Sequence, residues 1–126
     1  MSEYRTKPLI PSLLMAELAA VCEALSNEGV ELATVSFGWD SNLPIEEMWK
    51  DQQMPVKDIS TFVSKSEGAR VVEIGKADIF VESPGILFTL CHEGDAHVKG
   101  ESPLVKQITA RWQSLEYEPY ELPASA

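Results

Sequence analysis

The sequence has few of the residues that build disulfide frameworks, metal clusters or basic surfaces. It contains two cysteines, two histidines, and only 10 lysines and arginines against 20 aspartates and glutamates. The formal net charge of −10 argues against non-specific binding to nucleic acids or anionic membranes, because those surfaces are themselves negative. We therefore expect no nucleic acid and no membrane among its partners, which should be neutral, basic or small.

Long apolar runs and targeting signals are also missing. The first eight residues are polar, and no run is long enough to span a bilayer or to serve as a secretory signal. Cys22 and Cys91 lie far apart without C-x-x-C spacing, so we interpret both as reduced, buried thiols, with a redox pair as the less favoured alternative. These features predict a cytoplasmic protein.

The sequence shows no signature of a known catalytic site. It has no G-x-S-x-G elbow, P-loop, G-x-G-x-x-G or H-E-x-x-H motif. Cys91 and His92 are neighbours on a predicted strand and should point to opposite faces, with His97 on the His92 side. Neither histidine would then activate the thiol, so we nominate no catalytic residue and favour a non-catalytic protein.

What the sequence does contain is the pattern of one α+β domain covering residues 1–126. The hydrophobic fraction of 44% and charged fraction of 24% are ordinary for a globular chain. Alternation and turn residues predict a mainly antiparallel sheet of about five strands, at 30–37, 70–75, 78–83, 86–92 and 96–99. Helical periodicity predicts an N-terminal helix (12–28), a C-terminal helix (103–116) and a two-helix insertion (44–53 and 56–66).

The layers of this domain follow from the apolar faces of the helices. We expect the two terminal helices to pack on one face of the sheet, with the insertion covering an end or part of the other face. A polar N-terminal arm (1–8) and an acidic, proline-containing C-terminal tail (116–126) should flank the domain.

Residues 70–99 are predicted to form the antiparallel meander around which the chain is organised. A turn at residues 75–78 would pair the aliphatic residues of strands 70–75 and 78–83 on one face. Pro84-Gly85 fits the next turn, either as the whole two-residue loop or as part of a longer one.

The last turn of the meander carries the candidate metal site. A type II′ loop at Gly94-Asp95, or a four-residue loop at 93–96, would place His92 opposite His97, whereas a three-residue loop would separate them. Facing residues have Cβ atoms ~4.5–5.5 Å apart, so the pair could bind a divalent metal with Glu93, Asp95 or Cys91 as further ligands. Cys91 should point to the opposite face from His92, which weakens its place in this set. The alternative, which we favour, is two half-exposed histidines beside an acidic turn.

A second candidate site lies around the insertion, where Trp39, Asp40, Trp49 and Met54 are close in sequence. Aromatic residues and methionine are enriched at interfaces, so these residues could form an interaction surface. The alternative is that they cap one end of the core. The sequence thus favours a non-catalytic protein-interaction domain that binds a protein partner or self-associates. A small-ligand or metal-binding protein with its site at the His92/His97 hairpin is the alternative, and no cofactor other than that metal is expected.

Overall fold

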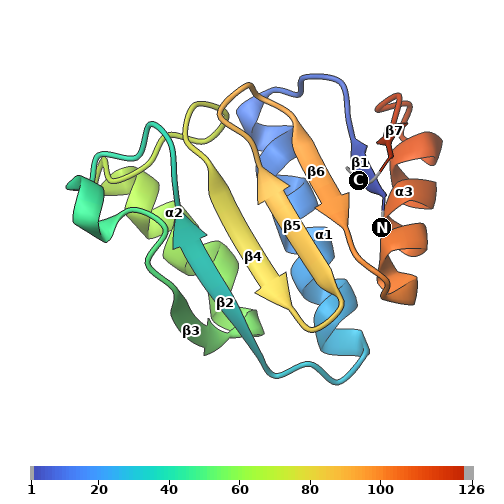
Figure 1. Cartoon of the computed structure of the whole chain (residues 1–126), viewed down its shortest axis with the longest axis horizontal. Helices are drawn as coiled ribbons and strands as arrows, with labels where there is room; N and C mark the ends of the chain where they lie inside the picture. Colours follow the sequence, from blue (N-terminus) through green and yellow to red (C-terminus); the bar gives the residue numbers. More distant parts are fainter. Residues whose placement is uncertain (1, 124–126) are drawn as a thin grey trace.

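A computed structural model describes residues 2–123 of the chain as an α+β fold, in which three helices pack against a seven-stranded antiparallel sheet (Figure 1). The strands are β1 (Glu3–Arg5), β2 (Leu32–Phe37), β3 (Gln52–Pro55), β4 (Ile79–Ser83), β5 (Ile86–Leu90), β6 (Ala96–Lys99) and β7 (Tyr120–Leu122). The helices are α1 (Pro11–Asn27), α2 (Ile59–Gly68) and α3 (Pro103–Ser114), with single 3₁₀ turns at Ile45–Glu47 and Val56–Asp58. The spatial strand order is β3-β2-β4-β5-β6-β1-β7. The predicted fold class is confirmed, with seven strands in place of five.

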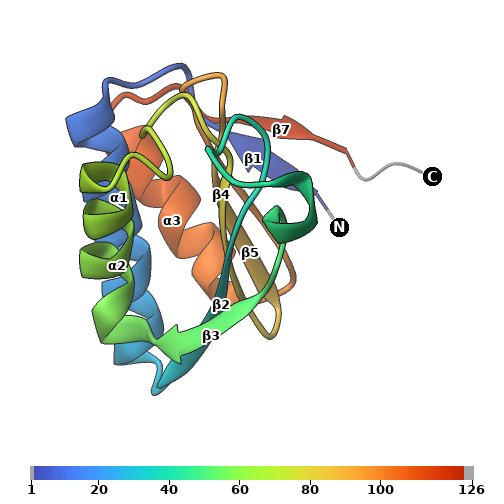
Figure 2. The same ribbon diagram turned by 90° about the vertical axis from the view of Figure 1, so that its left-hand side faces the viewer.

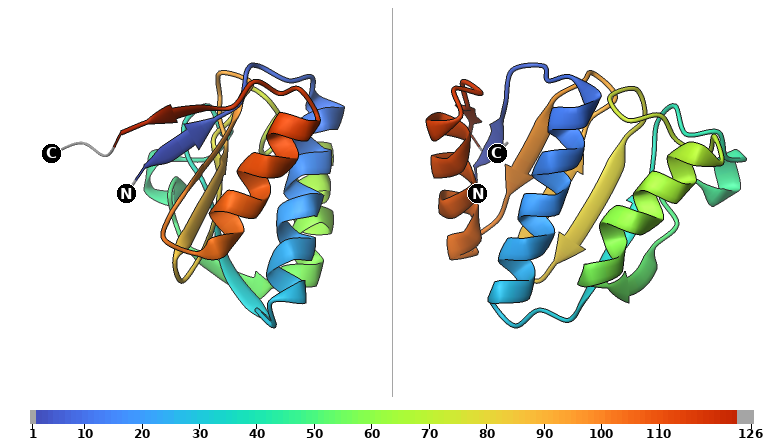
Figure 3. Two further views of the ribbon diagram at one scale, coloured as in Figure 1. Left: turned by 90° about the vertical axis from the view of Figure 1, so that its right-hand side faces the viewer. Right: turned by 180° about the vertical axis from the view of Figure 1, so that it is seen from behind.

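All three α-helices lie on the same side of the sheet (Figure 2), with α1 between α2 and α3 (Figure 3). The terminal helices begin and end within two residues of their predicted bounds. Proline occupies the first turn of both, and the hydroxyl of Ser102 accepts the backbone N–H of Leu104 at 3.2 Å, which caps α3. Of the two placements predicted for the insertion, an end of the sheet or part of its other face, the second is wrong for α2, which packs beside α1.

The core lies between the helices and the inward face of the central strands. One row across the sheet joins Val35, Val81, Phe88 and Val98 through consecutive cross-strand pairs, and all four side chains are buried. Trp112 of α3 is fully buried against this layer. The regular row fixes the register of the sheet, because a slip by one residue would expose every one of these side chains.

The predicted strand at 70–75 is wrong, and with it the first hairpin of the meander. Residues 70–78 form turns and irregular backbone, although Val72 and Ile74 are buried as their alternation suggested. Strand β4 pairs with β2 instead, so that Val81 faces Val35. The reason is that β2 offers β4 a long apolar partner, while the 70–78 segment can bury its aliphatic side chains without a ladder.

The predicted helix at 44–53 is also wrong beyond its first turn. After Ile45–Glu47 the backbone of Met48 is extended, and Trp49 adopts a left-handed conformation with φ of 59°. The N–H of Trp49 donates to the carbonyl oxygen of Phe37 at 2.6 Å, so it is not available to continue a helix. Residues 52–55 then form β3, which pairs with β2 at the edge of the sheet. The other predicted insertion helix, 56–66, corresponds to the 3₁₀ turn at Val56–Asp58 followed by α2.

The predicted arm and tail each contain a short strand. Strand β1 pairs with β6 on one side and β7 on the other, so the two ends of the chain complete the sheet together. These three-residue strands carry no alternation that a sequence pattern could reveal, and they form because β6 presents an open edge. Residues 1 and 124–126, which the arm and tail predictions include, lie outside the described range.

The rest of the meander, from β4 to β6, is confirmed. Pro84-Gly85 is a two-residue loop, since Ser83 pairs with Ile86, and the φ of 83° at Gly85 fits the glycine position of a type II turn. Strand β5 ends at Leu90, two residues before its predicted end. No helix within residues 2–123 is both long and apolar enough to cross a bilayer.

Candidate functional site

The candidate site is built on the turn between β5 and β6, at the upper end of the sheet in Figure 1. The N–H of Cys91 donates to the carbonyl oxygen of Asp95 at 2.8 Å, and the N–H of Gly94 donates to the carbonyl oxygen of Cys91 at 3.0 Å. Gly94 has a φ of 88°, a conformation that glycine adopts without steric cost. The loop therefore consists of the three residues 92–94, the length that separates the two histidines.

The prediction that His92 faces His97 is accordingly wrong. His97 pairs with Thr89 across the sheet, whereas His92 lies in the loop. Glu93 is exposed, and its Oε1 lies 3.8 Å from Nε2 of His92. The turn instead directs the two imidazoles toward different carboxylates, Asp78 directly before β4 and Asp95 directly before β6.

The first imidazole–carboxylate pair joins His92 to Asp78. Oδ1 of Asp78 accepts the backbone N–H of His92 at 2.8 Å and lies 2.7 Å from Nδ1 of the same residue. An ionised carboxylate can only accept, so Nδ1 is the donor. The hydrogen bond to Asp78 raises the pKa of His92, against an opposing effect of burial, and the charges of Asp78, Glu93 and Asp40 add to the increase. The Asp78 carboxylate and the Nδ1–H of His92 thus satisfy each other's hydrogen bonding.

The second pair joins His97 to Asp95 and is more deeply buried. Nε2 of His97 lies 2.8 Å from Oδ2 of Asp95, and the exposed fraction of Asp95 is 6%. The other oxygen, Oδ1, is a buried side-chain atom without a hydrogen-bond partner of ordinary geometry in residues 2–123. A buried carboxylate oxygen without a partner costs free energy that a cation could recover.

Cys91 stands between the two pairs. Its Sγ belongs to one group with ligand atoms of Asp78 and His92, and to another with those of Asp95 and His97, and within each group these atoms lie within 4.8 Å of one another. Burial raises the pKa of the Cys91 thiol to about 12. The N–H of Glu93 opposes this effect, while the charges of Asp95 and Asp78 and a side-chain hydrogen bond to Asp95 add to it. A protonated thiol is a poor nucleophile, so burial does not activate Cys91 for covalent catalysis.

Strand β1 and the residue that follows it, Thr6, pack beside the start of β6 and fix its position. Thr6 is buried, and its hydroxyl accepts the N–H of Ala96 at 3.1 Å while its own N–H donates to the carbonyl oxygen of Ala96 at 3.0 Å. Arg5 faces His97 in the neighbouring strand, and its guanidinium contacts Glu3 at 2.7 Å. Against the opposing effect of burial, the hydrogen bond and charge of Glu3 raise the pKa of Arg5, and the charges of Tyr120 and Asp95 add to the increase, so Arg5 acts on Asp95 as well as on its own strand.

The structure brings together only part of the predicted metal set. Asp95 and His97 share a group with Cys91, whereas His92 belongs to the other group and Glu93 to neither. The sequence argument missed Asp78 and set Cys91 aside. A usable signal existed for Asp78: a two-residue loop at Pro84-Gly85 pairs Ile79 with Leu90, and one further step places Asp78 opposite Cys91.

The residues of the second candidate site are also divided. The indoles of Trp39 and Trp49 are exposed by 58% and 41%, and their ring centroids lie 5.3 Å apart at an interplanar angle of 88°. Asp40 is exposed directly after Trp39. Met54 pairs with Ala33 and packs against the hydrophobic core, away from a surface role.

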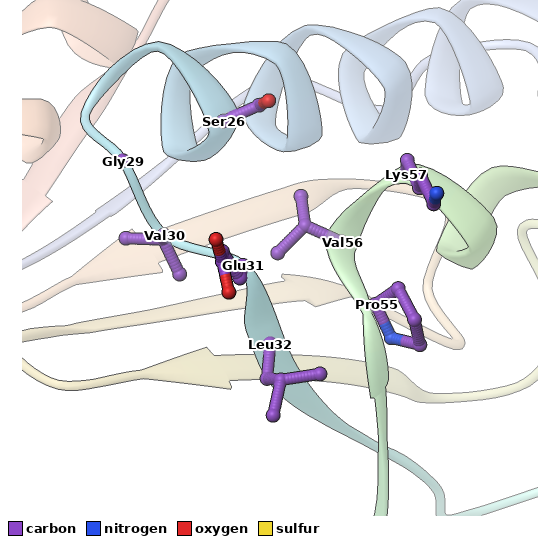
Figure 4. A pocket seen from close by; sticks show the side chains of 8 residues that line it. All are labelled: Ser26, Gly29, Val30, Glu31, Leu32, Pro55, Val56 and Lys57. Carbon is purple, nitrogen blue, oxygen red and sulfur yellow. The ribbon is translucent and has the colours of Figure 1, made fainter.

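A pocket at the other end of the sheet does not gather chemical groups. It has a volume of about 520 Å³ and lies where α1 ends and β2 begins, at the opposite end of the sheet from the β5–β6 turn (Figures 1 and 4). Glu31 and Lys57 are the charged side chains in its lining, which is otherwise small or aliphatic. Nothing in it resembles the convergence of ligand atoms around Cys91.

Comparisons with protein-family models, with curated proteins and with solved structures each found no match, so function has to be argued from the residues themselves.

Proposed function

We propose that this protein binds a transition-metal ion of the zinc class through Cys91, Asp95 and His97. The observation that carries the proposal is the partnerless Oδ1 of Asp95, buried in the same group as a thiol and an imidazole nitrogen. Of the predicted ligands, Asp95 and His97 remain in this set, Cys91 joins it, and His92 and Glu93 leave it.

The donor set supports zinc over harder cations. Thiolate sulfur, imidazole nitrogen and one carboxylate oxygen suit Zn²⁺ and Co²⁺, whereas Ca²⁺ and Mg²⁺ require mostly oxygen ligands. Zinc bonds of ~2.0–2.3 Å place ligand atoms roughly 3–4 Å apart, so the present separations of up to 4.8 Å need only small side-chain movements. Three protein ligands leave a fourth position for water or another group.

Metal binding would also resolve the protonation of the site. A thiol that coordinates the metal would release its proton to solvent, and the charge of the metal would offset the effect that burial has on Cys91. Nε2 of His97 is hydrogen-bonded to the Asp95 carboxylate in the metal-free protein. To bind a metal through Nε2, the imidazole has to carry its proton on Nδ1 instead. Asp78 and His92 already satisfy each other on the far side of the thiol and serve better as neighbours that orient Cys91 than as ligands.

Cobalt spectroscopy tests this proposal. Protein freed of metal with a chelator should develop thiolate-to-cobalt charge-transfer and tetrahedral d–d absorption when Co²⁺ is added, and Zn²⁺ should displace it. Cys91→Ala should abolish the thiolate band, while Asp95→Asn and His97→Ala should weaken binding strongly. Zn²⁺ at about 100 times its dissociation constant should raise the melting temperature of the wild type by on the order of 10 °C.

The chain contains a matched control for the thiol. Cys22 is the other cysteine, buried in α1, and Cys22→Ala should leave the cobalt spectrum unchanged. A wild-type spectrum without thiolate bands, or one that Cys91→Ala leaves intact, would rule out the proposed ligand set.

A further inference from the structure

A second surface, away from the Cys91 cluster, combines two exposed aromatic rings with an acidic groove. The perpendicular indoles of Trp39 and Trp49 lie in contact at 5.3 Å between centroids, and more than two-fifths of each side chain is exposed. The face of an indole ring attracts cations through its quadrupole, more strongly than the rings of tyrosine and phenylalanine do. Two adjoining indoles are the kind of wall against which a lysine or arginine side chain packs.

The backbone that presents these indoles is strained. Asp40 and Trp49 both adopt left-handed conformations, with φ of 60° and 59°, at the two ends of the loop. Such a conformation costs a bulky residue roughly 1–2 kcal/mol, and it persists where the surroundings enforce it. At Gly38 a Cβ atom would lie 2.6 Å from Nε1 of Trp49, so glycine at this position allows the indole to pack directly over the backbone.

The groove beside Trp39 carries the charge that a basic ligand requires. It has a volume of about 570 Å³, and its charged lining consists of Asp40, Glu67, Glu73 and Arg70. Glu73 also forms an ion pair with Lys76 at 3.5 Å, so Asp40 and Glu67 carry most of the free negative charge. Asp40 connects the groove directly to Trp39 in the chain. Glu67 accepts the backbone N–H of Ile74 at 2.8 Å and is held in place by it.

We propose that the surface formed by Trp39, Trp49 and the Asp40 groove docks a basic segment of a partner protein. A lysine or arginine side chain packs against the indoles, and a neighbouring basic residue enters the groove. A second copy of this chain is a poor occupant, because each copy carries a net charge of −10 and the two would repel each other. The proposal is independent of the metal site.

A peptide-binding experiment tests it with defined probes. A fluorescently labelled peptide of alternating arginine and glycine, and the matching glutamate–glycine peptide, are titrated with the full-length protein at about physiological salt, with binding read from anisotropy. The arginine peptide should bind and the glutamate peptide should not. Trp39→Ala should weaken binding about tenfold, and Trp39→Phe should restore part of it.

Two control variants separate a specific surface from general attraction to an acidic protein. Glu101→Gln removes the same charge as Asp40→Asn from an exposed position near the start of α3, and Tyr120→Ala removes an exposed aromatic ring from β7. Of these three substitutions, only Asp40→Asn should weaken binding, by a few-fold. The proposal fails if Trp39→Ala binds like the wild type, or if Glu101→Gln is as harmful as Asp40→Asn. It also fails if sedimentation shows a wild-type dimer that Trp39→Ala dissociates.

Discussion

Oδ1 of Asp78 holds His92 at two points, its backbone N–H at 2.8 Å and its Nδ1 at 2.7 Å. One carboxylate oxygen thereby fixes both the path of the turn and the orientation of the ring. The same contact raises the pKa of His92, with Asp78, Glu93 and Asp40 as the acidic groups that act on it. Because the folded state favours the protonated imidazole, part of its stability depends on pH.

The sign of this dependence gives the first prediction. A raised folded-state pKa contributes stability that is complete below the unfolded pKa of about 6.5 and is lost as the pH rises through the folded value. In chelator-treated protein, His92→Gln should therefore lower the free energy of unfolding more at about pH 5.5 than at about pH 8.5. Urea unfolding at a series of pH values measures this difference. A loss that is constant, or larger at high pH, would contradict the assigned contact.

A second prediction concerns Glu17, a buried carboxylate on α1. It accepts Nε1–H of Trp112 at 2.8 Å and two guanidinium donors of Arg111 at 3.0 and 2.9 Å, which ties α1 to α3. Glu17→Ala should cost about 2–4 kcal/mol of unfolding free energy, because it leaves a buried indole N–H without a partner. Glu17→Gln should cost less, since its amide oxygen can still accept from Trp112.

The control for Glu17 is Glu23, an exposed acid on the same helix. Glu23→Ala should change the unfolding free energy by no more than about 0.5 kcal/mol. Equal losses for Glu17→Ala and Glu23→Ala in urea titrations would show that the link to α3 does not stabilise the fold.

A pair of glycines gives the third prediction. Gly100 has a φ of 143°, and a Cβ there would collide with the carbonyl oxygen of Gly85 across the sheet end. Gly68 ends α2, and a Cβ there would meet no atom within 4 Å. Gly100→Ala should destabilise the protein by about 3 kcal/mol or more, whereas Gly68→Ala should be neutral or slightly stabilising. Thermal unfolding of both variants measures this difference. A Gly100→Ala variant as stable as the wild type would show that the backbones of Gly100 and Gly85 lie further apart than described.

The sequence predicted the elements whose stabilising partners are local. Helices α1 and α3 follow from proline and serine at their starts and from apolar stripes, and the β4–β5 register follows from a two-residue turn. Residues 70–75 show the limit of this reasoning. Val72 and Ile74 are buried as alternation suggests, yet the partner of β4 is β2, more than 40 residues earlier in the chain. Alternation reports which side chains are buried and says nothing about the strand beside them.

The sequence predicted which turn carries the candidate site, but it did not predict which side chains meet there. The choice between loop lengths decided whether His92 meets His97, and Gly94 adopts its left-handed conformation at the end of a three-residue loop. Because Cys91 then leads into a loop, the strand rule that sends neighbouring side chains to opposite faces no longer separates it from His92, and Sγ lies 3.8 Å from Nδ1. Asp78 reaches the site only through the β4–β5 pairing.

Equilibrium dialysis against Zn²⁺ tests the central claim most directly, with bound zinc counted per chain in the wild type, Cys91→Ala and Cys22→Ala. The proposed site predicts one tightly bound Zn²⁺ in the wild type and in Cys22→Ala, and none in Cys91→Ala. Wild-type protein that retains no zinc, or Cys91→Ala that retains as much as the wild type, would contradict it.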